Sequence, residues 1–203
     1  LPSDLLTRHY PVDNRKYEYY VNGALSVVYK IYYPARSGAY PVVYFLTGLN
    51  GVIPADYYQQ TMSLLASKGM IVVVPYGYLG EAFDFYAKAD RQVKYIYWTR
   101  YELDRVIKEI SGNSGISART EGGIILSSHS SGAQVIHLLY KKLRDQVRGL
   151  LYLDPVDGSP MQDTPRAVIP GEKMTDGKPV FVLNTDLCRV PGFYLFSWPP
   201  CCV

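Results

Sequence analysis

The pentapeptide Ser128–Gly132, Ser-His-Ser-Ser-Gly, has the residue types of a catalytic turn. A serine at a sharp strand-to-helix turn is the nucleophile of many hydrolases, in the general pattern Gly-x-Ser-x-Gly. The turn is tight because the serine has a strained backbone and its hydroxyl must stand above the sheet. Ser130 is therefore the candidate nucleophile, with Ser128 in place of the first glycine. The alternative is an ordinary serine-rich loop, since short motifs often occur by chance.

Acyl transfer by a serine also needs a base, an acid that orients the base, and donors for the developing oxyanion. Ser131 begins a predicted helix, so its backbone N–H is free to be one oxyanion donor. The N–H of Leu49 is the second candidate, because Gly48 lets the backbone approach closely. Asp154 follows the next predicted strand, where the chain order Ser…Asp…His places the acid.

The elements that must position these residues alternate between strands and helices. Asn22-Gly23 is a strong hairpin signal, so the flanking residues are predicted to form an antiparallel pair. The predicted strands are 17–21, 25–33, 42–46, 70–74, 122–127, 150–153 and 179–184, and the predicted helices are about 56–68, 93–110 and 133–143. This order indicates an α/β fold with a mostly parallel sheet, an N-terminal antiparallel hairpin and helices on both faces. We expect an N-terminal arm over residues 1–16 and a single domain over residues 17–203.

The composition is that of a folded protein, since 48% of the 203 residues are hydrophobic and 19% are charged. The net charge is +3 and the basic residues are scattered, which gives no support to a nucleic-acid partner or a polybasic membrane contact. No apolar run approaches the roughly 20 residues that a transmembrane helix needs. No Cys/His spacing resembles a zinc site, so we expect neither a metal nor a cofactor.

The three cysteines, Cys188, Cys201 and Cys202, all lie near the C-terminal end. Adjacent cysteines rarely bridge each other without strain, and an odd number points to an intermolecular partner or a free thiol. We interpret them as disulfide formers in an oxidising compartment. The first residue is Leu1, so we expect a processed and secreted chain, although a truncated chain would begin in the same way.

Four segments of the chain resemble the chlorophyllase branch of the α/β-hydrolases. That family has a His-Gly strand end, "LLxxIASHGFIVVAP", "GHSRGG" and "xDPVxG", and the similar segments here are residues 42–51, 63–75, 128–133 and 153–158. The last segment, which contains Asp-Pro-Val-Asp-Gly, is the most specific. The resemblance implies a serine esterase acting on a hydrophobic ester, with Ser130 as nucleophile and Asp154 as the acid of the triad. The family's own substrate is the phytyl ester of a chlorophyll.

The chain departs from the family pattern at four positions around the site. Thr47 stands in place of histidine, Ser128 in place of the first elbow glycine, Ser131 in place of arginine and Ala133 in place of glycine. Because the oxyanion donors are backbone groups, these changes need not abolish the chemistry. We expect them to reshape the floor of the pocket.

The base is missing from its expected place. The family's catalytic histidine lies after the last strand, whereas no histidine follows His137 in this chain. His137 is about 10 Å along the helix from Ser130. His129 adjoins the serine, so its ring cannot readily face the hydroxyl, and we interpret it as packed beneath the loop. His9 lies in the arm.

Two interpretations of the missing base remain open. In the first, the histidine belongs to a C-terminal fragment or second chain that is attached through one of the terminal cysteines. In the second, the protein is a catalytically inactive α/β-hydrolase that binds a pigment or lipid. The Gly-, Phe- and Tyr-rich segment 76–90 could line the pocket in either case.

Overall fold

The computed structural model describes residues 7, 9–21, 24–76, 84–155 and 177–183. Within them, eight strands form one sheet in the order β1-β2-β4-β3-β6-β7-β8, and β5 pairs with β3 beside this path. The strands are β1 (Val12–Val21), β2 (Ala24–Pro34), β3 (Gly38–Leu46), β4 (Ile71–Tyr76), β5 (Ile116–Arg119), β6 (Ile124–His129), β7 (Val147–Leu153) and β8 (Val180–Leu183). The helices are α2 (Gly48–Gly51), α3 (Gln59–Ser67), α4 (Phe85–Tyr101), α5 (Leu103–Ser111) and α6 (Gly132–Leu143), with 3₁₀ turns η1 (Ala55–Tyr58) and η2 (Arg144–Gln146).

The sheet is antiparallel at its N-terminal edge and parallel elsewhere. β1 pairs with β2 and β2 with β4 in antiparallel register, whereas the pairs β3–β4, β3–β6, β6–β7 and β7–β8 are parallel. The predicted hairpin and mostly parallel sheet are therefore confirmed. β1 begins earlier than expected, because residues 12–16 pair with β2 up to Pro34. These residues belong to the sheet and not to an irregular arm.

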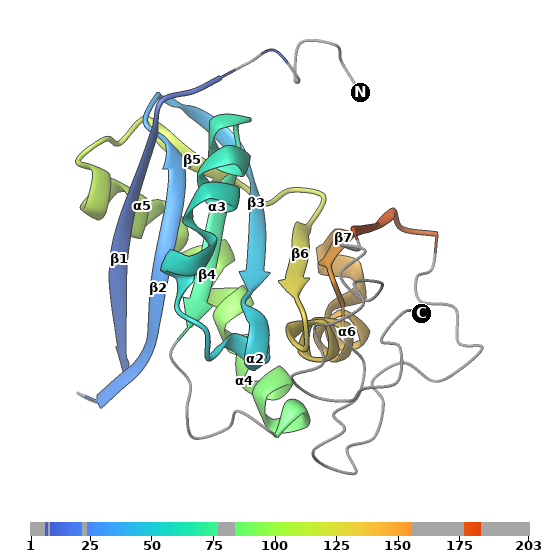
Figure 1. Cartoon of the computed structure of the whole chain (residues 1–203). Helices are drawn as coiled ribbons and strands as arrows, with labels where there is room; N and C mark the ends of the chain where they lie inside the picture. The colour runs from blue at the N-terminus through green and yellow to red at the C-terminus, as the bar shows by residue number, and fades with distance from the viewer. Residues whose placement is uncertain (1–6, 8, 22–23, 77–83, 156–176, 184–203) are drawn as a thin grey trace.

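Helices cover both faces of the sheet, and each face has its own apolar core (Figure 1). Side chains alternate between the two cores along each strand, as the two-residue period of a strand requires. On β4, Val73 faces the core formed with α4, α5 and α6, whereas Val72 and Val74 face the core formed with α3. Strands buried on both faces give continuous apolar runs, which explains why their positions were predictable.

The helices differ from the prediction at two places. The expected helix over 93–110 is two helices, since α4 runs from Phe85 to Tyr101 and α5 begins at Leu103 after Glu102. Asp84 begins α4 by accepting a hydrogen bond from the Ala87 N–H at 2.8 Å. The helix expected from about residue 56 starts at Gln59, after the 3₁₀ turn η1. In the described ranges, no helix is both long enough and apolar enough to cross a membrane.

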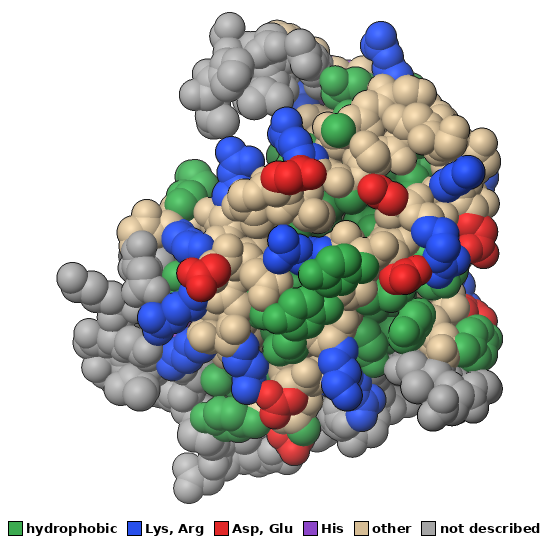
Figure 2. Space-filling model, turned by 180° about the vertical axis from the view of Figure 1, so that it is seen from behind, with side chains coloured by type: hydrophobic (Ala, Val, Ile, Leu, Met, Phe, Trp, Pro, Cys, Tyr) green, Lys and Arg blue, Asp and Glu red, His purple; other side chains and the backbone are tan. Residues whose placement is uncertain are grey.

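The charged side chains are mixed over the face of the molecule seen in Figure 2. Lys and Arg side chains lie among Asp and Glu there and do not gather in one basic patch. In the described part of the chain, Lys142 pairs with Asp90 at 2.6 Å and Arg105 with Glu102 at 2.8 Å. Positive and negative side chains are therefore interspersed on the described part of this face.

Candidate active site

Residues with a strained backbone lie together at the edge of the sheet formed by the carboxyl ends of the parallel strands. Among the described residues, four that are not glycine have a positive φ: Leu49 (49°), Asn50 (55°), Ser130 (53°) and Asp154 (42°). A side chain makes such a conformation costly, by about 1–3 kcal/mol, so it persists only where the surrounding structure imposes it. All four lie just after the carboxyl ends of β3, β6 or β7. They include three of the residues that the sequence predicts for the site.

The turn Ser128–Gly132, which we call the elbow, joins β6 to α6. The Ser130 N–H donates to the Leu153 carbonyl at 3.0 Å, and the Ser130 carbonyl accepts from the Ala133 N–H at 3.0 Å. A Cβ at Gly132 would lie 2.8 Å from the Thr47 carbonyl oxygen, which is too close for any side chain. The second glycine of the motif is therefore required by the contact between the elbow and the end of β3.

The first glycine position of the motif, which Ser128 occupies, does not require a glycine here. Ser128 is fully buried at the end of β6, where it is in register with Leu46 of β3 and Tyr152 of β7. It is not among the residues with a positive φ. A residue with a Cβ therefore fits at this position without backbone strain.

The segment Thr47–Gly51, which we call the oxyanion loop, follows β3 as a left-handed turn. Leu49 and Asn50 have ψ values of 41° and 40°, and Gly51 continues the turn with a φ of 86°. The Thr47 hydroxyl, which stands where the family has histidine, donates to the Ile53 carbonyl at 2.7 Å and closes the loop. Thr47 therefore has a structural contact of its own.

Two backbone N–H groups at these strand ends are the predicted oxyanion donors. Within the described part of the chain, no hydrogen bond uses the N–H of Leu49 or that of Ser131. Ser131 is the N-cap of α6, whose partial positive charge favours an anion nearby. The elbow and the oxyanion loop adjoin at Gly132 and Thr47, so both donors lie at the same edge of the sheet.

A tyrosine that the sequence analysis did not single out links the oxyanion loop to the elbow. The Gly48 N–H donates to the Tyr58 hydroxyl at 2.9 Å, and this hydroxyl lies 2.9 Å from Nδ1 of His129. Burial lowers the pKa of His129, and the negative charge of Asp154 raises it by a smaller amount. Burial also raises the pKa of Tyr58. The imidazole is therefore neutral and the phenol protonated at neutral pH, so the contact is a hydrogen bond between two neutral groups whose donor is set by the imidazole tautomer.

Asp154 follows β7 directly, at the position where the sequence predicts the acid. Its N–H donates to the Leu183 carbonyl of β8 at 2.7 Å, and this bond helps to impose its positive φ. The residue before it, Leu153, is in register with His129 of β6, so Asp154 follows its strand beside the elbow. The side chain is partly buried.

The three histidines of the chain lie in three different surroundings. His129 contacts Tyr58, and His137 is buried within α6. His9 lies 3.1 Å from the Lys68 Nζ and shares a surface pocket with Arg36 and Gly38. Gly38 begins β3, and the strand spans about 30 Å from there to the oxyanion loop.

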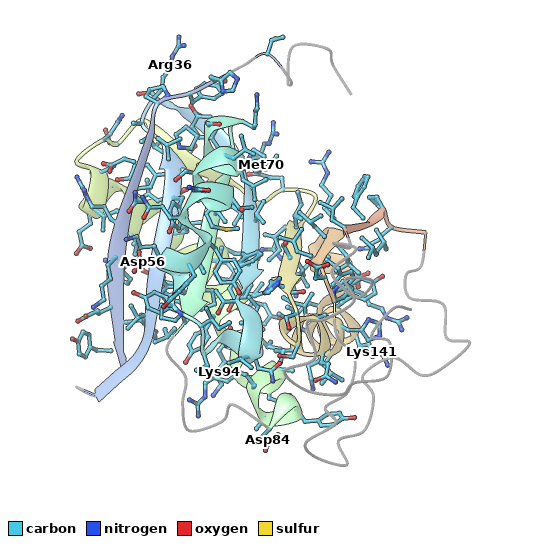
Figure 3. All side chains as sticks on the ribbon, viewed as in Figure 1. Arg36, Asp56, Met70, Asp84, Lys94 and Lys141 are labelled. Atoms are coloured by element: carbon cyan, nitrogen blue, oxygen red, sulfur yellow. The ribbon has the colours of Figure 1, made fainter. Side chains whose placement is uncertain are left out.

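Figure 3 shows the separation between the pocket of His9 and the oxyanion loop. Arg36, which lines that pocket, and Asp84 lie at opposite ends of the molecule, and α2 lies at the Asp84 end. Within the described residues, no hydrogen bond joins a histidine ring to Ser130. The structure thus gathers the predicted serine, aspartate and oxyanion donors at one edge, without a histidine base at the serine.

Some of the predicted features lie outside the described residues. Cys188, Cys201 and Cys202 do, as do residues 77–83 of the aromatic segment and residues 156–176 after Asp154. In the ranges that the structure describes, no three His, Cys, Asp or Glu side chains gather closely enough to hold a metal ion.

Comparison with known proteins identifies relatives of the chain. The chlorophyllase family model matches residues 7–202. None of the curated proteins matches the chain significantly.

Among solved structures, the chain is similar to vibralactone cyclase (14% identity, TM-score 0.54, 81% of this chain and 47% of that one). It is also similar to a fungal esterase from Rhizomucor miehei (15%, 0.55, 79% and 50%) and to an arylesterase (16%, 0.52, 79% and 52%). The chain thus spans about half the length of these structures. With its fold and its family match together, the chain belongs to the chlorophyllase family and has the α/β-hydrolase fold.

Proposed function

We propose that the protein is a serine carboxylic-ester hydrolase that acts on hydrophobic esters. The observation that carries this proposal is the strained Ser130 at the β6–α6 turn, at the same ends of the strands as the N–H groups of Leu49 and Ser131, which no group among the described residues accepts. Strain of this kind is typical of active sites, where it holds a nucleophile in place. Membership of the chlorophyllase family supports the same chemistry.

The proposed reaction follows the usual two steps of a serine esterase. Ser130 Oγ attacks the ester carbonyl and gives its proton to a histidine, while the N–H groups of Leu49 and Ser131 hold the oxyanion. The C–O bond to the alcohol then breaks, and the histidine returns the proton to the leaving alcohol. Water attacks the acyl-serine in the second step, and the acid and free Ser130 are released. Asp154 orients the histidine and stabilises its charged form.

We propose that this histidine comes from a C-terminal fragment or a second chain, held by one of the terminal cysteines. The placement of the chain's own histidines supports this, because His129 is engaged by Tyr58 and His9 lies at the opposite end of β3. Secretion and disulfide formation by Cys188, Cys201 or Cys202 are part of the same proposal.

The proposed substrate is an ester with a large apolar group. Leu49 supports this, because its side chain is 58% exposed although it is apolar, and it stands on the loop that would hold the oxyanion. An apolar alcohol or acyl group packed there would lose contact with water, which favours binding. The phytyl ester of a chlorophyll is the candidate that the family suggests. The second candidate function is binding of a pigment or lipid without catalysis, which the lack of a base at Ser130 favours.

A fluorophosphonate probe on natively isolated protein tests the proposal. We expect the probe to label the wild type and the control Ser114→Ala, whose exposed serine lies in the loop before β5, and not to label Ser130→Ala. Intact mass with and without reductant then shows whether a histidine-containing chain is released. Absence of labelling in the natively isolated protein would overturn the esterase and favour the binding protein.

A further inference from the structure

We propose that Tyr58 is a positioning residue that fixes the oxyanion loop relative to the nucleophile, a role that rests on the proposed function. Tyr58 ends η1 and is the N-cap of α3, so it belongs to neither the elbow nor the oxyanion loop. Its hydroxyl nevertheless contacts both of them.

The two partners of the hydroxyl are the residues that precede the reacting groups. Gly48, whose N–H the hydroxyl accepts at 2.9 Å, immediately precedes the donor Leu49. His129, whose Nδ1 lies 2.9 Å away, immediately precedes the nucleophile Ser130. One oxygen atom therefore ties together the backbones that carry the oxyanion donor and the attacking oxygen.

The tyrosine is itself held firmly. Its ring packs against Phe45 of β3 at a centroid distance of 5.2 Å and against the His129 ring at 5.5 Å. At Gly48, a Cβ would lie 3.0 Å from each of three atoms, His129 Nδ1, Tyr58 Oη and Ile53 Cδ1. This junction is tightly packed, so the hydroxyl cannot move toward one partner without leaving the other.

The oxyanion loop needs such an anchor because its conformation is costly. Leu49 and Asn50 are both left-handed, and an unanchored loop would relax and turn the Leu49 N–H away from the oxyanion. Loss of one oxyanion donor lowers kcat by roughly 100- to 1,000-fold in other enzymes. A displaced donor costs less than an absent one, so we expect a fall of about 10- to 100-fold when the hydroxyl is removed.

The test compares Tyr58→Phe with Tyr57→Phe in the natively isolated protein, with p-nitrophenyl butyrate as substrate. Tyr57 is the matched control, because it adjoins Tyr58 and is 82% exposed. We expect Tyr58→Phe to lower kcat with little change in KM, and to weaken binding of a trifluoromethyl ketone by the same factor. A role only in folding would lower the melting temperature without this selective loss. Equal kcat in the two variants would overturn the proposal.

Substitutions at His129 keep the proposal testable if Tyr58→Phe does not fold. His129→Asn places an amide oxygen near the position of Nδ1 and should preserve most of kcat, whereas His129→Leu should lose as much as Tyr58→Phe. The double variant Tyr58→Phe/His129→Leu should be no worse than either single variant, because both break one link. Equal activity of the Asn and Leu variants would contradict the link.

The two proposals fail in different ways. If the wild type and Ser130→Ala are equally inactive toward the ester and the probe, the esterase itself is overturned, and the role of Tyr58 with it. If the wild type is active, Ser130→Ala is inactive and Tyr58→Phe matches Tyr57→Phe, only the role of Tyr58 is overturned.

Discussion

At Gly132 the limit on the side chain comes from a neighbouring strand and not from the backbone angles. Gly132 is absent from the glycines with a positive φ, yet a Cβ there would lie 2.8 Å from the Thr47 carbonyl oxygen and 3.0 Å from that of Leu46. The motif glycine thus allows α6 to start directly against the end of β3. This contact sets how far the elbow stands from the oxyanion loop.

We expect Gly132→Ala to lower the free energy of unfolding by about 1–3 kcal/mol, because backbone atoms must move to admit the methyl group. The same movement should lower esterase activity, since it separates the two oxyanion donors. Urea unfolding and hydrolysis of p-nitrophenyl butyrate measure the two effects. Gly122→Ala is the comparison, because that glycine has a φ of 81° but nothing within 4 Å of its Cβ. Loss of activity in both variants alike would contradict a local effect at the site.

The partly buried imidazole of His129 makes stability depend on pH. Because the fold lowers the pKa of His129, the unfolded chain binds this proton more readily than the folded chain does. The free energy of unfolding therefore rises with pH in this range. The stabilisation is fully present above the unfolded pKa of about 6.5 and is lost as the pH falls toward the folded value.

We expect the wild type to lose more stability between pH 7.5 and pH 5 than His129→Asn does. Urea unfolding at the two pH values measures the difference, with His9→Asn as a control because that side chain is exposed. A parallel loss in the wild type and His129→Asn would show that other groups determine the acid limit.

Among the elements, α3 continues directly from η1 and packs with Tyr58 against the sheet. Met62 and Ala66 of α3 are fully buried in the same core as Phe45, Val72 and Val74. Few side chains make up this core, so each contributes a large part of it. The proposed anchoring of the oxyanion loop through Tyr58 therefore depends on the packing of α3.

Met62→Ala should lower the free energy of unfolding by about 2–5 kcal/mol through the cavity that it leaves. Leu64→Ala on the same helix is the control, because that side chain is 55% exposed and its truncation removes little packing. Urea unfolding of the two variants gives the comparison. Equal losses would mean that α3 is not held by its buried face.

The elements that the sequence analysis missed have physical reasons for being missed. β5 pairs with residues 38–41 of β3, but Ile116 is the only buried residue of its four, so there is no apolar run to detect. The first part of β1 is an edge strand with the polar sequence Asp-Asn-Arg-Lys at residues 13–16. Helical periodicity continues across Glu102, so the division into α4 and α5 at that residue is not encoded in the apolar pattern.

For the whole molecule, local patterns were enough to predict the architecture and the edge at which the site lies. The buried parallel strands gave continuous apolar runs, and the elbow motif and Asp154 fell at strand ends that the topology brings together. Tyr58 could not be predicted in this way. Its partner His129 lies 71 residues away in the chain, and only the packing of η1 over β3 joins the two.

The proposed use of main-chain donors by the oxyanion loop and the elbow has a consequence for evolutionary divergence. Since the N–H groups at Leu49 and Ser131 do not depend on the side chains they carry, selection for a new ester can change those side chains while the reaction persists. Positions that support only the backbone geometry, such as Gly48 and Gly132, have no such freedom, because a methyl group would strike its neighbours there. In this fold, the residues that limit divergence are therefore those that keep the two loops close together. The identities of the side chains nearest the reacting atoms are poor indicators of whether activity has been lost.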